Sequence, residues 1–173
     1  MGKQGIKGII GGVLVIVAFF GVRYGLGQYR EMQSTLDEEI VYAYYQKQIN
    51  AIRTFDAETQ CKMMHPRFRG VEEARTPAGN QTVVMDRREA CKSIRESMDT
   101  MKAVVKALEA EPDMKFTIES VDLTPDRRQA EVKLRYAMDI GKKLSISATG
   151  SETLMRHKGD VYVIDSQSKS VIK

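Results

Sequence analysis

The stretch "AEVKLRYAMDI", residues 130–140, carries the clearest structural pattern in this chain of 173 residues. Apolar or aromatic side chains occupy every second position from Ala130 to Ile140, and the positions between them hold mostly charged residues. A period of two places alternate side chains on opposite faces of a β-strand. The stretch therefore predicts a strand with one face in the core and the other in water.

Neighbouring segments extend this strand into a sheet. Residues 115–123 and 144–156, and the residues from Val161 onward, predict three more strands. The turn sequences "TPDRR" (124–128) and "HKGD" (157–160) separate successive strands. Because short connections join antiparallel neighbours, we expect these four strands to form an antiparallel meander.

Helices are predicted upstream of the meander. We expect Ser34 or Thr35 to cap a helix that continues to about Arg53. A short helix over residues 57–64 should follow and end before Pro66, since the residue before a proline disfavours helical geometry.

The next segment leads into the strongest helix signal of the chain. Residues 67–74 predict a strand and residues 76–81 a turn. Asp86 then forms a capping box with Glu89. An apolar stripe at helical spacing follows: Ala90, Ile94, Met98, Met101, Val105 and Leu108. Helices followed by a curved antiparallel sheet predict an α+β fold, with about three helices packed on one sheet face.

Residues 8–26, which begin at Gly8 and end at Leu26, form the most apolar segment. A helix of this length spans about 28 Å, close to the roughly 30 Å hydrocarbon core of a bilayer, provided that Arg23 reaches the interface. Lys3 and Lys7 precede the segment and favour a cytoplasmic N-terminus. We therefore expect a transmembrane helix. The alternative is a cleaved signal peptide, for which the small-residue cleavage site is poor.

The predicted organisation is a short tail and anchor over residues 1–27, a linker over residues 28–34 and an extracytoplasmic domain over residues 35–173. The net charge of +4 does not indicate nucleic-acid binding, because most of it arises at the N-terminus. Three of the 27 basic residues lie before residue 28, which leaves 24 against 23 acidic residues. We expect no nucleic-acid partner.

Cys61 and Cys91 are the only cysteines. In an oxidising compartment an even number of cysteines suggests a disulfide, and the alternative is two unrelated buried thiols. His65 and His157 are isolated in the sequence and join no cluster of ligand spacing, so no metal site is predicted.

The order of these elements resembles the nuclear transport factor 2-like superfamily. The resemblance covers about residues 35–172, through "MMHPRFRGVE", "MDRREACKSIRESM", "RRQAEVKLRYAMDI" and "GSETLMRHKGDVYVID". It implies a cone in which the helices cover a strongly bent sheet. Within the superfamily the chain resembles uncharacterised bacterial envelope proteins with an N-terminal hydrophobic segment and a cysteine in each of the same two helices. This implies a single-pass protein of the bacterial inner membrane with its domain in the periplasm.

Enzymes of this superfamily place an acid, a histidine or a tyrosine inside the cone, where burial tunes its pKa. Neither the apolar face of the 130–140 strand nor the stripe of the 90–108 helix contains an acid or a histidine, so no catalytic residue and no cofactor is predicted. His65 is expected to cap a helix end in its charged form. Six residues are candidates for lining a pocket, with core packing as the alternative for each: Tyr44, Tyr45, Met98, Met101, Tyr136 and Met138.

These observations favour a membrane-anchored, non-catalytic interaction or scaffold module of the cell envelope, with envelope proteins or a second copy as partners. A first alternative is a binding protein for a small hydrophobic molecule or lipid in the cone. A second alternative is an isomerase- or cyclase-like enzyme.

Overall fold

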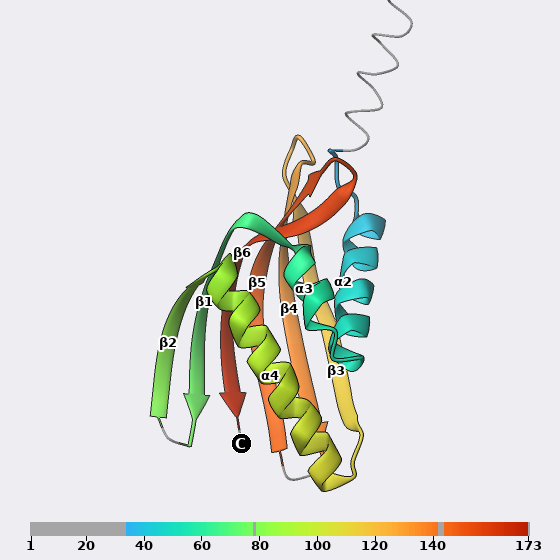
Figure 1. Cartoon of the computed structure of the whole chain (residues 1–173). Helices are drawn as coiled ribbons and strands as arrows, with labels where there is room; N and C mark the ends of the chain where they lie inside the picture. The colour runs from blue at the N-terminus through green and yellow to red at the C-terminus, as the bar shows by residue number, and fades with distance from the viewer. Residues whose placement is uncertain (1–33, 78, 142–143, 173) are drawn as a thin grey trace, which may run out of the picture.

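The computed structural model describes residues 34–77, 79–141 and 144–172. In these residues three helices cover one face of a curved six-stranded sheet, which confirms the predicted α+β class (Figure 1). The predicted anchor, residues 8–26, lies outside the described residues. Within them, no helix has both the length and the apolarity needed to cross a bilayer.

The predicted antiparallel meander is present. Its strands are β3 (Pro112–Leu123), β4 (Gln129–Ile140), β5 (Leu144–His157) and β6 (Asp160–Ile172). The alternation in β4 decides which face is covered, because its even-numbered side chains point into the core. Ala130, Val132, Met138 and Ile140 are each at most 2% exposed.

The sheet is mixed, so the prediction of a purely antiparallel sheet was wrong. β1 (Met64–Thr76) pairs with β6 in the parallel direction. No short turn connects these two strands, and the sequence patterns therefore contained no information on their relative direction.

A sixth strand, β2 (Gly79–Asp86), pairs antiparallel with β1 and forms one edge of the sheet (Figure 1). The predicted turn over residues 76–81 is shorter than expected, because β2 already begins at Gly79. All residues of β2 except Met85 are exposed, and Val84 is 69% exposed. With no buried face the strand lacks the alternation by which the other strands were recognised.

The three helices begin at aspartate caps. Asp37, and not Ser34 or Thr35, caps α2 (Glu38–Arg53) by accepting a hydrogen bond from the Ile40 backbone N–H at 2.8 Å. Asp56 caps α3 (Ala57–Met63) in the same way.

The third helix, α4 (Arg87–Leu108), begins with the predicted capping box between Asp86 and Glu89. It crosses the covered face of the sheet diagonally (Figure 1). Ala90 and Met98 of its predicted stripe are buried, and Ile94 packs against the core.

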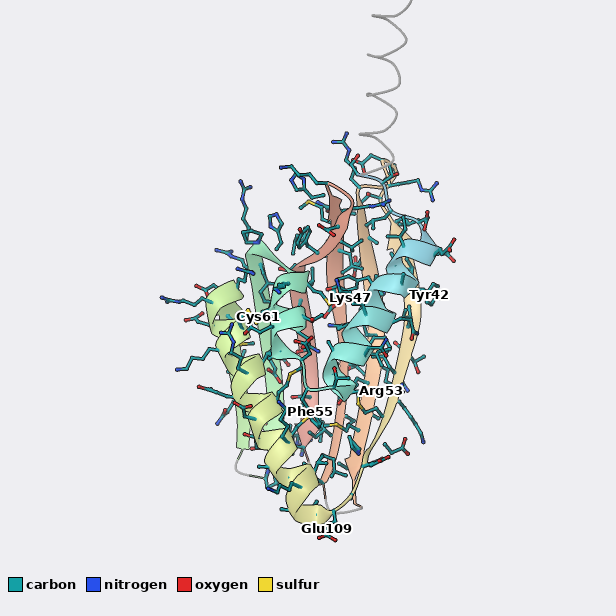
Figure 2. The ribbon with its side chains drawn as sticks, turned by 45° about the vertical axis from the view of Figure 1, so that its right-hand side comes forward. Tyr42, Lys47, Arg53, Phe55, Cys61 and Glu109 are labelled. Carbon is teal, nitrogen blue, oxygen red and sulfur yellow. A yellow bond between two sulfur atoms is a disulfide. The ribbon has the colours of Figure 1, made fainter. Side chains whose placement is uncertain are left out.

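The predicted disulfide joins Cys61 on α3 to Cys91 on α4, with 5.3 Å between the two Cα atoms. Both residues are buried, and Figure 2 shows Cys61 where the two helices meet. The Arg87 guanidinium reinforces the same contact, because it donates hydrogen bonds to the backbone carbonyls of Cys61 and Met64, each at 3.1 Å. The relative position of α3 and α4 is therefore set covalently as well as by packing.

Replacing both Cys61 and Cys91 by serine should lower the free energy of unfolding by about 3.5 kcal/mol, because the unfolded chain regains the entropy of a loop of about 30 residues. Urea unfolding of the oxidised protein and the double variant measures this difference. A reducing agent should lower the stability of the wild type and leave the double variant unchanged. Equal stability of the two proteins would contradict the structural role of this bond.

Candidate functional site

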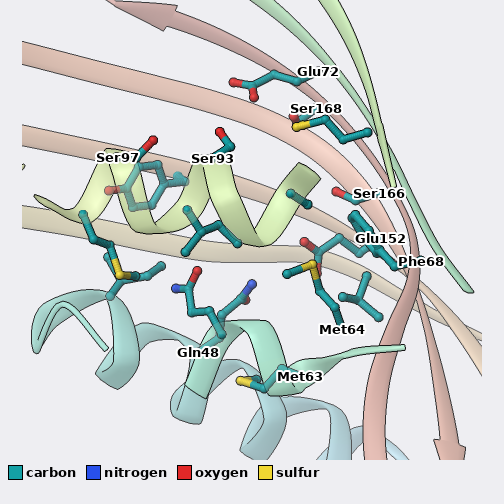
Figure 3. A pocket seen from close by; sticks show the side chains of 18 of the residues that line it. Gln48, Met63, Met64, Phe68, Glu72, Ser93, Ser97, Glu152, Ser166 and Ser168 are labelled. Atoms are coloured by element: carbon teal, nitrogen blue, oxygen red, sulfur yellow. The ribbon is translucent and has the colours of Figure 1, made fainter. Parts of the chain in front are cut away.

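A cavity of about 390 Å³ lies between the three helices and the sheet. Phe68 and other apolar side chains line it. Five methionines are among the lining residues: Met63, Met64, Met85, Met98 and Met101. Its volume falls within the range of about 300–1,000 Å³ that small-molecule sites occupy. Figure 3 shows that polar groups enter from opposite sides, with Gln48 among the helices and Glu72, Ser166 and Ser168 on the strand side.

Strand register brings an acid to the covered face of the sheet. On β5 the alternation that begins with Leu144 and Ile146 continues through Ala148, Gly150, Glu152 and Leu154. Glu152 is paired with Val132 of β4 on one side and Ser166 of β6 on the other. The covered face is thus apolar over β4 and polar where β5, β6 and β1 meet.

Gly150 is needed at the edge of this polar region. A Cβ atom at this position would overlap the backbone carbonyl oxygen of Gln167 on β6. The missing side chain lets the two strands approach closely, and Ser168 and Glu72 occupy the same row on the next two strands. The row is therefore polar on β6 and β1, where Ser168 and Glu72 line the cavity.

Glu152 is the principal titratable group of the cavity. Tyr45 Oη donates a hydrogen bond to Glu152 Oε2 at 3.0 Å. The residue keeps some accessible surface because it borders the cavity, but protein surrounds its carboxyl group. This burial raises the pKa of Glu152 to about 7, although the hydrogen bond from Tyr45 acts in the opposite direction. Glu152 is therefore half-protonated near neutral pH.

Besides Glu152, three residues of this cavity each have a buried polar atom that makes no hydrogen bond within the described part of the chain. The atoms are Tyr44 Oη, Gln48 Oε1 and Gln60 Nε2. Burial raises the pKa of Tyr44, and the negative charge of Glu152 acts in the same direction. A buried polar group without a partner costs about 1–3 kcal/mol. All three residues line the same cavity.

Four of the six predicted pocket residues lie on the wall of this cavity: Tyr44, Met98, Met101 and Tyr136. The other two lie behind it. Tyr45 is 1% exposed and reaches the cavity only through Glu152, and Met138 Sδ accepts a hydrogen bond from Tyr136 Oη at 3.1 Å. Burial raises the pKa of Tyr136 to about 12, so its hydroxyl stays protonated at neutral pH.

The expectation of a cone without an acid was wrong because it was drawn from β4 and α4 alone. The signal for Glu152 is present in "LSISATGSETL", residues 144–154, where counting by two from Leu144 reaches Glu152 before Leu154. Gln48 and Gln60 carried no comparable signal, because glutamine is common on exposed helix faces.

His65 does not cap a helix, because β1 already begins at Met64. Its Nδ1 accepts a hydrogen bond from the Arg67 backbone N–H at 3.2 Å. Burial, with electrostatic repulsion from the Arg67 and His157 side chains, lowers the pKa of His65, so the expectation of a charged histidine was also wrong. Among the described residues no group of His, Cys, Asp or Glu side chains is arranged to hold a metal ion.

Solved structures share this architecture. A conserved protein from Planctomyces limnophilus superposes with a TM-score of 0.54 at 12% identity, over 79% of this chain and 98% of that protein. An NTF2-like protein from Cytophaga hutchinsonii gives a TM-score of 0.51 at 11% identity, over 78% and 98%. An NTF-2 like protein of unknown function from Silicibacter pomeroyi gives 0.50 at 13%, over 78% and 94%.

The chain therefore has the nuclear transport factor 2-like fold that its element order resembles. No protein-family model matches the sequence, and no curated protein matches it significantly. Identities this low establish the fold alone, and proteins of this fold carry out many unrelated functions. The function must be argued from the cavity.

Replacing Glu152 by glutamine should make stability less dependent on pH. In the unfolded chain Glu152 loses its proton near pH 4.5, whereas in the native wild type burial keeps the proton on until about pH 7. Between these pH values the unfolded state is therefore increasingly favoured, and the wild type loses stability as the pH rises. The free energy of unfolding of the variant should match that of the wild type near pH 4 and exceed it by about 3 kcal/mol at pH 8.

Urea unfolding at several pH values measures this difference. Glu131→Gln is the matched control, because Glu131 is exposed on the neighbouring strand. Two parallel stability curves for the wild type and Glu152→Gln would contradict the assigned environment of Glu152.

Proposed function

We propose that the described domain binds a small molecule in the cone cavity. The observation that carries this proposal is the convergence of Glu152 and three unpartnered buried polar atoms on one cavity with apolar walls. Small-molecule sites combine apolar walls with a few polar groups that orient the ligand. A domain that used its cone only as a packed core would gain stability from apolar residues at these positions.

Methionine methyl groups provide a direct test, because they report from inside and outside the cavity at once. In the full chain, held in phosphatidylcholine nanodiscs and labelled with ¹³C at the methionine methyls, 4-phenylbutanol should shift the signals of Met63, Met98 and Met101. The signals of Met114 and Met155, which do not line the cavity, should stay unchanged.

Ser93→Trp on α4 should fill the cavity and abolish these shifts. Thr100→Trp adds the same side chain at an exposed position of the same helix and should preserve them. Shifts that persist in Ser93→Trp, or that appear equally at Met114 and Met155, would show that the alcohol binds elsewhere and would overturn the proposal.

We propose that this domain works at the outer face of the bacterial inner membrane, anchored by residues 8–26. The length and apolarity of that segment and the Cys61–Cys91 disulfide support this setting, because disulfides persist in oxidising compartments. The same layout suits the interaction or scaffold role considered above, with envelope proteins or a second copy as partners. The cavity favours a ligand-binding role.

The anchor proposal predicts that the full chain stays in the membrane fraction after a carbonate wash, and that a version lacking residues 1–27 does not. The intact mass of the mature protein distinguishes an anchor, which retains these residues, from a signal peptide, which is removed. Recovery of the full chain from the cytosol with two titratable thiols would contradict both the anchor and the signal peptide.

An isomerase- or cyclase-like activity is a second candidate, and one observation favours it. A carboxyl group with a pKa near 7 can act as a general acid or base at neutral pH, and Glu152 borders the space that a substrate would occupy. Any turnover in this cavity must then disappear in Glu152→Gln, and a substrate that is still converted by that variant would exclude the role.

A further inference from the structure

The side chains around the cavity carry charge of one sign only. Among the described lining residues, Glu72 and Glu152 are acidic, and there is no lysine, arginine or histidine. Lys47 and Lys62 line a separate hollow that shares Tyr44 and Met63 with this wall. A carboxylate or phosphate entering the cavity would therefore meet two acids and no cation.

Among the residues that the structure describes, neither acid is paired with a basic side chain. Glu152 Oε2 accepts its hydrogen bond from Tyr45, and Glu72 Oε1 accepts one from Ser170 Oγ at 3.1 Å. The four ion pairs found among the described residues all involve other acids, and their side chains are largely exposed. Within the described residues Glu152 Oε1 has no donor, so a ligand can supply one.

The remaining walls suit a cation with an apolar body. The rings of Tyr44, Phe68 and Tyr136 border the cavity, and aromatic faces attract ammonium groups. Methionine side chains are polarisable and adapt to alkyl or aryl groups. The Gln48 amide oxygen adds a buried acceptor that has no donor in the described part of the chain. An ammonium group carries three donors and no acceptor, which matches these unpartnered acceptors.

We infer that the ligand of this cavity is a hydrophobic amine, bound in its protonated form with its ammonium group on Glu152. The inference rests on the proposed ligand-binding function and specifies the chemical class of the ligand. It excludes fatty acids and other anionic amphiphiles as ligands of the same site.

Binding of such an amine should depend on pH through Glu152. Tyr44 and Tyr45 on α2 interact electrostatically with Glu152, and the other titratable residues that line the cavity are Tyr136 on β4 and Glu72 on β1. The tyrosines stay neutral because burial raises the pKa of each. Below pH 7 a bound ammonium must displace the proton of Glu152, so the affinity should rise as the pH rises through 7.

Three ligands with one body and different head groups test the inference on the full chain in phosphatidylcholine nanodiscs, with empty nanodiscs as the blank. They are 4-phenylbutylamine, 4-phenylbutanol and 4-phenylbutanoate, and the methionine methyl signals of the cavity report binding. At pH 7.5 we expect the amine to bind at least about tenfold more tightly than the carboxylate, as one strong charge interaction allows. Its affinity should fall about eightfold between pH 7.5 and pH 6.

Glu152→Gln should reduce the affinity for the amine to that for the alcohol and remove the pH dependence. Glu131→Gln removes one exposed carboxylate from the same sheet. This variant should leave the affinity for the amine and its pH dependence unchanged. The inference is overturned if the alcohol or the carboxylate binds as tightly as the amine. It is also overturned if Glu152→Gln binds the amine as tightly as the wild type does. In both cases the proposed ligand-binding function stands. If none of the three compounds shifts the methyl signals of the cavity methionines, the amine inference and the proposed ligand-binding function are both overturned.

Discussion

The hydrogen bond from Tyr45 to Glu152 is the interaction on which the rest of the site depends. It joins α2 to the sheet where the apolar core ends and the cavity begins. Tyr45 is almost fully buried and stacks near Phe116, with 5.4 Å between the ring centroids, so its hydroxyl is held in place by the core. The carboxyl group of Glu152 is thereby fixed by one oxygen, and the other remains available to the cavity.

The sequence was sufficient to predict most of the scaffold. The alternation over residues 130–140 and the capping box at Asp86 report strong local constraints, and both elements are present as expected. β2 and the parallel pairing of β1 with β6 were not predicted. An exposed edge strand has no burial pattern, and the direction of a pairing between distant segments is decided by tertiary packing.

The site was predicted only in part, because its polar residues interrupt the patterns used to find the core. Tyr44, Met98, Met101 and Tyr136 were recognised because they lie on apolar faces that also line the cavity. Glu152 lies on such a face as well, but one acid within an alternating strand resembles a register break unless the count is continued to Leu154. Gln48 and Gln60 become notable only when the structure shows that their polar atoms are buried without partners.

The parallel pairing of β1 with β6 also governs the order in which the domain assembles. Residues 64–76 emerge from the ribosome about a hundred residues before the strand that pairs with them, and that strand is the last one described. Contacts so distant along the chain form slowly, because a long loop must close before they contribute. During synthesis β1 therefore has only the hairpin partner β2 beside it, and its other edge stays open to wrong partners until β6 arrives.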